Sequence, residues 1–224
     1  MDFLKKRWLK WQLKRLHKGD AQAMARVYRV RDPWGLDVPS EHMRFKETSR
    51  MIRDRMGSHF DSILEIGSGE GLQTKYLAPL ADRILGIDPS PHAVKRAEIL
   101  NVPNATFEVG DLLNSPASAK DRVFDLVTAC EVIYYLEDCQ LEQAFQNLNR
   151  LGRMCVVTYY QGMYARLDPF FKNKPVKMEA LQTESGQWRF IWWPSTMNAE
   201  QTRTAVSQSA STPVPNLVST TNSK

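Results

Sequence analysis

Short apolar runs alternate with helix-like patterns through the middle of the chain. The apolar runs predict buried strands in five segments: 62–67, 83–88, 105–111, 123–130 and 154–160. Helical spacing lies between them, in segments 71–81, 91–101 and 141–151. Strands and helices that alternate at this spacing are typical of βαβ units. We therefore expect a parallel sheet with helices on both faces.

Two further strand-like runs follow, at 176–183 and 187–193, joined by Glu184-Ser185-Gly186. A connection of this length predicts a hairpin, so the sheet should end in an antiparallel pair. The expected fold class is α/β: a doubly wound, mostly parallel, Rossmann-like sheet of seven strands with an N-terminal helical cap.

The two ends of the chain differ from this core. Residues 1–18 form a basic amphipathic pattern, and residues 19–57 a cap or lid segment whose helix begins at Pro39 or Ser40 and ends at Gly57. The core domain spans 58–194, and the polar segment 195–224 predicts a disordered tail. The helix at 3–18 suits either peripheral contact with a membrane or a lipid-linked substrate, or packing on the domain itself.

Composition narrows the partners and the compartment. The chain has 224 residues, 42 % hydrophobic and 25 % charged, which fits one globular domain. The first 18 residues hold seven Lys/Arg and one Asp, which leaves 23 basic against 24 acidic residues elsewhere. This balance disfavours a nucleic-acid partner. Three scattered cysteines and four unpaired histidines predict neither disulfides nor a metal site, and favour a cytoplasmic location, free or at the inner face of a membrane.

Candidate chemistry gathers where the first three strands end. Gly67, Gly69 and Gly71 follow the first strand and let a ligand approach the backbone. Asp88 ends the second strand, where a carboxylate can accept hydrogen bonds from ribose hydroxyls, and Asp111 ends the third, within reach of an adenine amino group. Together these positions predict one nucleoside crevice. The G-x-G-x-G spacing differs from the G-x-G-x-x-G of dinucleotide sites, so a dehydrogenase is disfavoured.

The strings LEIGSGEG (64–71), GID (86–88), GD (110–111) and FDLVTACEVIYYLED (124–138) resemble the motifs of class I S-adenosylmethionine-dependent methyltransferases. The resemblance implies S-adenosylmethionine as cofactor and makes 58–194 the domain that binds it. It also implies a set of cofactor-binding residues at the strand ends: Glu65, Gly67, Ser68, Gly69, Gly71, Asp88, Pro89, Asp111, Leu112 and Cys130.

DPWGLD (32–37) and CEVIYYLED (130–138) are similar to the NodS-like group of nodulation-factor N-methyltransferases. That likeness implies an acceptor amine on an oligosaccharide, although the basic first helix and the polar tail depart from the group. The wider expectation is methyl transfer to an amine or hydroxyl of a small, oligosaccharide or glycolipid-type acceptor, by in-line displacement. The alternative is a non-catalytic protein that binds S-adenosylmethionine as a sensor or partner at a membrane.

Methyl transfer mainly requires orientation, and an amine acceptor must also lose a proton. Glu131 follows the fourth strand and is the candidate base, or a contact that orients the acceptor, with Tyr134 as the second catalytic candidate. Tyr135 and Trp34 are candidates for substrate contact, Trp34 as part of a lid. The alternative for Glu131 is a solvated or helix-capping carboxylate, for one of the two tyrosines core packing, and for Trp34 a buried anchor of the turn.

Overall fold

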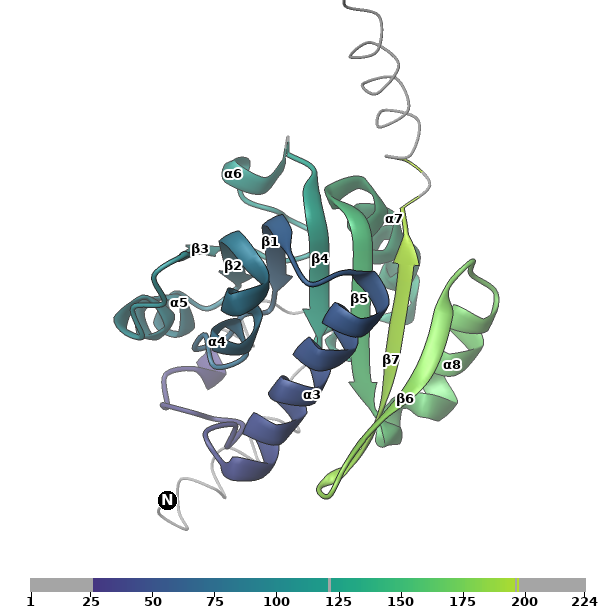
Figure 1. The fold of residues 1–224 in the computed structure, drawn as a ribbon, viewed down its shortest axis with the longest axis horizontal. Helices are drawn as coiled ribbons and strands as arrows, with labels where there is room; N and C mark the ends of the chain where they lie inside the picture. The colour runs from purple at the N-terminus through teal and green to yellow at the C-terminus, as the bar shows by residue number, and fades with distance from the viewer. Residues whose placement is uncertain (1–25, 121, 196, 198–224) are drawn as a thin grey trace, which may run out of the picture.

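The computed structural model describes residues 26–120, 122–195 and 197. Seven strands form one sheet in the order β3-β2-β1-β4-β5-β7-β6 (Figure 1). The strands are β1 (Phe60–Ile66), β2 (Ala81–Asp88), β3 (Ala105–Val109), β4 (Phe124–Cys130), β5 (Gly152–Tyr160), β6 (Lys177–Thr183) and β7 (Gly186–Pro194). The predicted fold class is confirmed.

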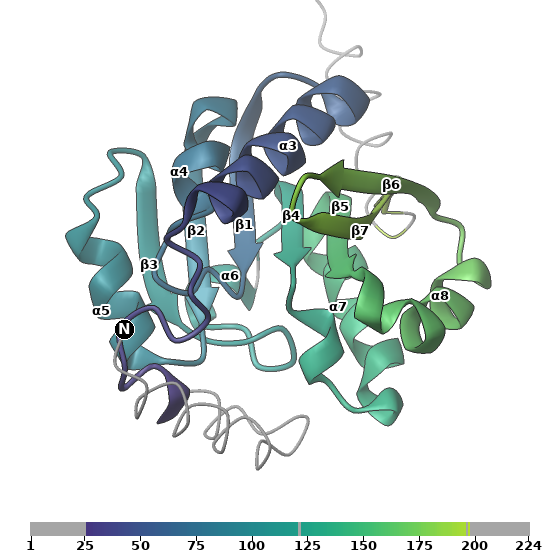
Figure 2. The same cartoon turned by 90° about the horizontal axis from the view of Figure 1, so that it is seen from below.

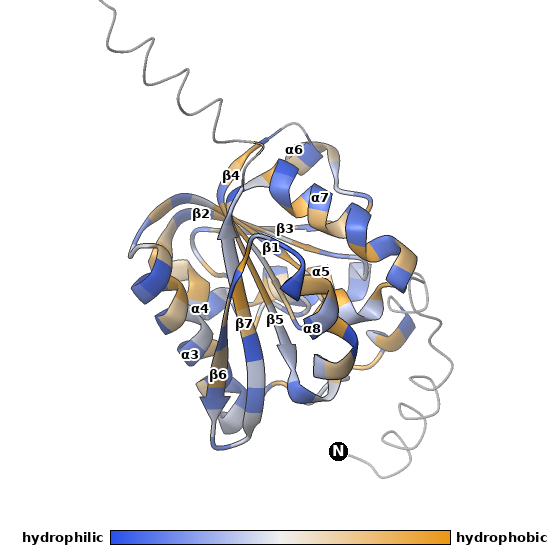
Figure 3. Cartoon of the chain, turned by 90° about the vertical axis from the view of Figure 1, so that its right-hand side faces the viewer, coloured by the Kyte–Doolittle hydropathy of each residue, from blue (hydrophilic) through white to orange (hydrophobic). Residues whose placement is uncertain are grey.

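The first five strands are parallel, and the last two run antiparallel to their neighbours. β6 forms the edge of the sheet, and the hairpin then returns β7 to the position between β6 and β5, with Thr183 opposite Gly186. β1 and β4 are buried along almost their whole length, as their continuous apolar runs require. Figure 3 shows the apolar residues concentrated on the strands and hydrophilic residues on the outer sides of α6 and α7.

Helices cover both faces of the sheet. The described helices are α3 (Pro39–Met56), α4 (Thr74–Leu77), α5 (Pro91–Ile99), α6 (Ala117–Lys120), α7 (Leu141–Leu151) and α8 (Tyr164–Lys172). Figure 2 shows α3 and α4 above the sheet and α7 below it. One apolar core lies beneath α3 and α4, and a second includes residues of α6, α7 and α8.

Three helical regions differ from the prediction. The helix expected over 71–81 is only α4, followed by the 3₁₀ turn η1 (Ala78–Leu80). Pro79 explains the early end, because proline has no N–H and its ring crowds the preceding turn. α6 and α8 lie in regions for which no helix was predicted, and Pro169 interrupts the sequence pattern of α8. The cap helix α3 does begin at Pro39 and end before Gly57.

The predicted basic helix at 3–18 and nearly all of the predicted tail lie outside the described residues. Ser195, the first residue of that tail, is buried, and its hydroxyl donates a hydrogen bond to the backbone oxygen of Asn149. In the described part of the chain, no helix combines the length and the apolar character needed to cross a membrane.

Candidate functional site

A cavity of about 460 Å³ opens at the carboxyl ends of β1, β2 and β4. The chain runs from β1 toward one edge of the sheet and from β4 toward the other, so the strand order reverses here. In doubly wound sheets this is the crevice that takes ligands. All the residues expected to bind cofactor or substrate line this cavity, except Gly71.

The glycine loop after β1 lies tight against the end of β2. The backbone N–H groups of Gly67 and Ser68 both donate to the carbonyl of Ile87. Gly67 has φ +69°, and a Cβ there would come within 2.3 Å of Val132. Gly71 instead packs toward α5, where a Cβ would meet Ala97 at 3.2 Å. The first two glycines therefore shape the cavity, while Gly71 lets the loop pack closely on a helix.

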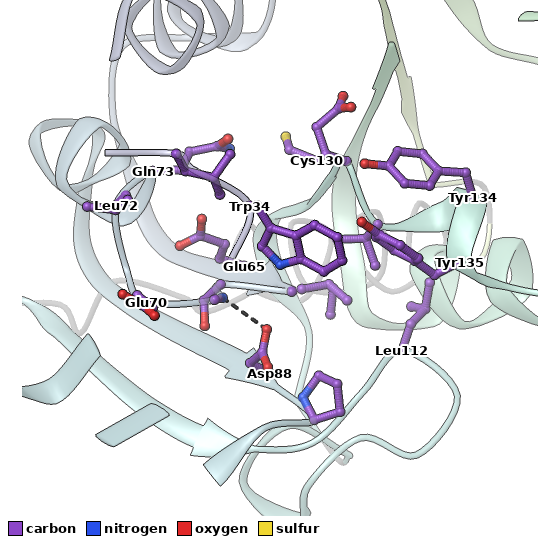
Figure 4. A pocket seen from close by; sticks show the side chains of 18 of the residues that line it. Trp34, Glu65, Glu70, Leu72, Gln73, Asp88, Leu112, Cys130, Tyr134 and Tyr135 are labelled. Carbon is purple, nitrogen blue, oxygen red and sulfur yellow. Dashed lines mark hydrogen bonds between the residues drawn. The ribbon is translucent and has the colours of Figure 1, made fainter. Parts of the chain in front are cut away.

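Asp88 connects the glycine loop to α5. Its Oδ2 accepts a hydrogen bond from Gly69 N at 3.0 Å, which Figure 4 marks with a dashed line, and its Oδ1 accepts one from Ser90 N at 2.9 Å. Burial raises the pKa of this carboxyl to about 6, against the opposing effect of both hydrogen bonds. Each oxygen keeps a lone pair for a ligand, since an ionised carboxylate accepts about four hydrogen bonds.

Glu65, near the end of β1, is 3 % exposed and lines the cavity. Thr74 Oγ1 donates to its Oε2 at 2.5 Å. Burial raises the pKa of Glu65 to about 7, and the nearby charge of Asp88 adds to this rise. A cationic ligand would stabilise both carboxylates in their charged form.

The loop after β3 brings Asp111 and Leu112 to the cavity, and the end of β2 brings Pro89. Asp111 Oδ1 accepts backbone hydrogen bonds from Leu113 and Asn114, both at 2.7 Å. The turn therefore fixes the Asp111 carboxylate, and buried Leu112 provides an apolar wall beside it.

Glu131 has the conformation of a residue under backbone strain. Its φ is +60°, a left-handed value that glycine accommodates best. Its N–H donates to the carbonyl of Thr158, and Thr158 Oγ1 donates to its Oε1 at 3.0 Å. Burial raises the pKa of Glu131 to about 7, with Arg44 opposing the rise. The structure thus holds at the end of β4 a carboxyl that changes charge near neutral pH.

Burial raises the pKa of the neighbouring Cys130 thiol to about 11. A thiol with that pKa stays protonated at neutral pH, which argues against a nucleophilic role. Burial also raises the pKa of Tyr134 well above its ordinary value, so its hydroxyl can donate a hydrogen bond but does not act as a base.

Aromatic rings form a continuous wall across the cavity. The ring of Trp34 lies 5.6 Å from that of Tyr135, which lies 4.6 Å from Tyr134. Figure 4 shows Trp34 in the centre of the view, between Glu65 and Tyr135. Trp34 therefore lines the cavity beside Tyr135, and its role as a lid stays a prediction.

The cap segment around Trp34 is attached directly to the glycine loop. Glu70 Oε1 accepts a hydrogen bond from the backbone N of Asp32 and lies 2.8 Å from Arg96 Nε. Arg96 in turn donates to the carbonyls of Tyr28 and Val30. These contacts hold the cap segment over the loop.

Several further residues line the same cavity without having been predicted from the sequence: Arg44, Phe45, Gln73, Tyr160 and Trp188. Arg44 had one local signal, because it follows Glu41 at the i,i+3 spacing of an ion pair and precedes an apolar residue. Trp188 had none, since its place in an alternating strand reads as ordinary packing.

Away from the cavity, exposed His59, Asp61 and Asp82 lie close enough together to share an ion. They stand at the start of β1 and β2, the opposite end of the sheet. Exposed groups of this kind are common without a metal, so the trio assigns no function.

Comparison with known proteins agrees with this geometry. A family model described as a methyltransferase domain matches residues 63–154. Nodulation protein S of Bradyrhizobium diazoefficiens is 31 % identical over 131 residues, which cover 57 % of this chain and 60 % of that protein. Nodulation protein S of Rhizobium tropici is also 31 % identical, over 58 % of this chain and 54 % of its own length. The chain thus spans little more than half the length of these relatives.

Among solved structures, the N-methyltransferase NodS from Bradyrhizobium japonicum WM9, in complex with S-adenosyl-L-homocysteine, has a TM-score of 0.63. It is 23 % identical, and the match covers 79 % of this chain and 98 % of that one. At this identity the likeness shows the fold. Together the matches confirm the resemblance to class I S-adenosylmethionine-dependent methyltransferases and, among them, to NodS.

Proposed function

We propose that this chain is an S-adenosylmethionine-dependent methyltransferase that transfers a methyl group to an amine. The observation that carries the proposal is the cavity at the reversal of strand order. It joins a glycine loop, a ribose-type carboxylate at Asp88 and a proton acceptor at Glu131. The match of residues 63–154 to a methyltransferase domain supports it.

The residues of the cavity fit such a cofactor. Its volume of about 460 Å³ falls within the usual range of ligand sites, about 300–1,000 Å³. Gly67 has no side chain, and a larger residue at this position would collide with Val132 beside the cavity. Asp88 would hold the ribose hydroxyls, the loop of Leu112 would pack on the adenine, and Glu65 would face the methionine portion.

The charge of the cavity favours cationic ligands. Among the described residues that line it, Arg44 is the only basic one. Seven lining residues are acidic: Asp32, Glu41, Glu65, Glu70, Asp88, Asp111 and Glu131. S-adenosylmethionine carries a sulfonium, an ammonium group and one carboxylate, so its net charge is positive, and a protonated amine acceptor adds another positive centre. Opposite charge at short range stabilises such groups, more strongly where water is excluded.

When bound, S-adenosylmethionine supplies a methyl group on a positively charged sulfur, so the leaving group needs no acid. The chain must then align the acceptor and remove its proton. Glu131 can accept that proton, since its pKa of about 7 places it between the charged and neutral forms. The aromatic wall of Trp34, Tyr134 and Tyr135 excludes water and offers faces on which a sugar ring can stack.

An amine is the better acceptor for this site than a hydroxyl. A hydroxyl requires removal of a far less acidic proton, and a carboxylate with a pKa near 7 is a weak base for that step. The relatives carry the same implication, since the NodS structure is named as an N-methyltransferase. An oligosaccharide-type amine is therefore the first acceptor class to test.

Calorimetric titration of S-adenosylmethionine, S-adenosylhomocysteine and NAD into the full chain tests the cofactor. We expect both sulfur nucleosides to bind and NAD not to bind. Asp88→Ala should weaken their binding, while Asp82→Ala, at the exposed start of the same strand, should not. Binding of NAD, or of none of the three, would refute the proposal.

A turnover assay tests whether the chain catalyses methyl transfer. Release of S-adenosylhomocysteine would be measured with amino-sugar acceptors and with the matching sugars in which a hydroxyl replaces the amine. Methylation of the amino sugars alone is the expected result. Binding of the cofactor without turnover on any amine would support a non-catalytic binding protein instead.

A further inference from the structure

The tyrosine part of the cavity wall lies on a short segment that is held at both of its ends. The 3₁₀ turn η2 (Ile133–Tyr135) carries Tyr134 and Tyr135, and both rings point toward the middle of the cavity (Figure 4). At the start of the segment, the N–H of Glu131 donates to the carbonyl of Thr158, and Thr158 Oγ1 donates to the Glu131 carboxylate. The other end is held by a side chain from a distant part of the chain.

That side chain is Arg166 on α8. Its Nη1 donates to the carbonyl of Tyr134 at 2.9 Å, and its Nη2 donates to the carbonyl of Leu136 at 2.6 Å. Its Nε donates to Asp138 Oδ1 at 2.7 Å. One guanidinium therefore uses all of its nitrogens to hold the backbone that leads out of η2.

The two contacts with carbonyl groups are the stronger part of this attachment. The Asp138 side chain is 80 % exposed, so its ion pair with Arg166 contributes little. The Arg166 side chain is 18 % exposed, and Tyr134 and Leu136 are half-buried. A hydrogen bond from a charged donor is stronger than one between neutral groups, and shielding from water strengthens it further.

α8 is itself fixed to the sheet, so Arg166 projects from a rigid support. Asp168 is 8 % exposed and accepts a hydrogen bond from the Tyr159 hydroxyl of β5 at 2.8 Å. It also accepts one from Arg189 Nη2 of β7 at 2.6 Å. Residues two positions apart on a helix do not face the same side. Asp168 thus ties α8 to the sheet, while Arg166 reaches the turn.

We propose that Arg166 is a positioning residue for methyl transfer, which keeps Tyr134 and Tyr135 in the cavity wall by holding the carbonyl groups of the turn that carries them. This inference rests on the methyltransferase function proposed above. Arg166 acts through the two tyrosines and does not itself line the cavity. Because methyl transfer depends on orientation, a displacement of about 1 Å in the wall can lower the rate up to about a hundredfold.

Turnover of Arg166→Lys and Arg166→Gln tests this role. Lysine keeps the charge but lacks the planar fork that binds both carbonyl groups, and glutamine also removes the charge. With glucosamine or its β-1,4-linked tetramer as acceptor, kcat should fall at least about tenfold in both variants. The midpoint of the pH–rate profile should stay at about 7, because Thr158 holds Glu131 independently of Arg166. Lys172→Gln, at an exposed position of the same helix, is the matched control and should keep the wild-type kcat.

Fluorine NMR follows the tyrosine rings directly. The full chain is labelled with 3-fluorotyrosine, and single Tyr→Phe variants assign the resonances of Tyr134, Tyr135 and Tyr76. In Arg166→Lys, the resonances of Tyr134 and Tyr135 should move toward the chemical shift of free 3-fluorotyrosine. The resonance of Tyr76 should stay in place, since this ring packs on α3 and its hydroxyl is hydrogen-bonded to His42. A general loss of structure would move all of these resonances.

Three results would overturn the assignment. They are unchanged resonances of Tyr134 and Tyr135 in Arg166→Lys, an unchanged kcat in both Arg166 variants, and movement of the Tyr76 resonance together with the other two. A wild-type chain that methylates no amine would instead remove the function on which the assignment rests. The NMR measurement needs neither cofactor nor acceptor, so the two failures are distinct.

Discussion

Replacing Glu65 with glutamine should stabilise the ligand-free protein at alkaline pH while weakening its ligand site. Glu65 is 3 % exposed, and burial raises the pKa of its carboxyl from 4.5 to about 7. At about 1.4 kcal/mol per unit of pKa, this difference corresponds to about 3 kcal/mol of folding free energy. Glutamine keeps an oxygen that can accept the hydrogen bond from Thr74 and carries no charge.

The direction of the change in stability with pH follows from the protonation of Glu65 in the folded and unfolded states. Above pH 7 the carboxyl is charged in the folded and the unfolded chain, so the folded protein bears the full unfavourable energy of burying it. Below pH 4.5 it is protonated in both states, and that energy disappears. Through Glu65 alone, the unfolding free energy of the wild-type protein should fall by about 3 kcal/mol as the pH rises from 4.5 to 7.

Urea unfolding of the ligand-free proteins measures this difference. At pH 8 the Glu65→Gln variant should be more stable by about 3 kcal/mol, and the gain should shrink as the pH falls toward 4.5. Glu131 titrates in both proteins, so its contribution cancels, whereas the repulsion between Glu65 and Asp88 is part of the gain that is measured. Glu98→Gln, at an exposed position on α5, is the control. Equal stability at pH 8, or a gain independent of pH, would refute the reasoning.

Three further variants separate the roles in the cavity. Asp88→Asn should weaken binding of S-adenosylhomocysteine at least about tenfold by calorimetry, because asparagine has one acceptor oxygen where aspartate has two, each of which accepts a backbone hydrogen bond. Unchanged affinity would contradict the role of Asp88. Glu131→Gln should lower kcat and remove the increase in rate that the wild-type protein shows as the pH rises through about 7. An unaltered pH–rate profile would exclude Glu131 as the base. Trp34→Ala should speed the dissociation of S-adenosylhomocysteine in stopped-flow measurements, because the lid loses its contact with Tyr135; an unchanged rate would mean that Trp34 only anchors the turn.

Much of the fold could be predicted because local patterns determine it. The continuous apolar runs of β1, β2 and β4 require burial on both faces, which only a sheet covered on both sides provides. The order in which β7 enters beside β5 depends on contacts between distant segments, and no local pattern encodes it. The shortening of α4 was readable in principle from Pro79, since the helical spacing continues past a residue that cannot donate.

The candidate site also has one part that could be predicted from the sequence and one part that could not. Asp88, Asp111 and Glu131 could be predicted as neighbours because the carboxyl ends of parallel strands meet at one edge of the sheet. Arg44 and Trp188 come from a cap helix and the last strand, and only the tertiary structure brings them together. Their contribution to the cavity could therefore not be predicted from the sequence.

The left-handed backbone of Glu131 has a consequence for how this position tolerates substitution. Glycine, and to a lesser degree asparagine, adopts φ near +60° more readily than glutamate. In a saturation scan read out by abundance in cells, glycine should therefore rank above the native residue. Read out by methyl transfer, the order should reverse. A position where the two rankings oppose each other is one that selection has kept for chemistry against the preference of the backbone.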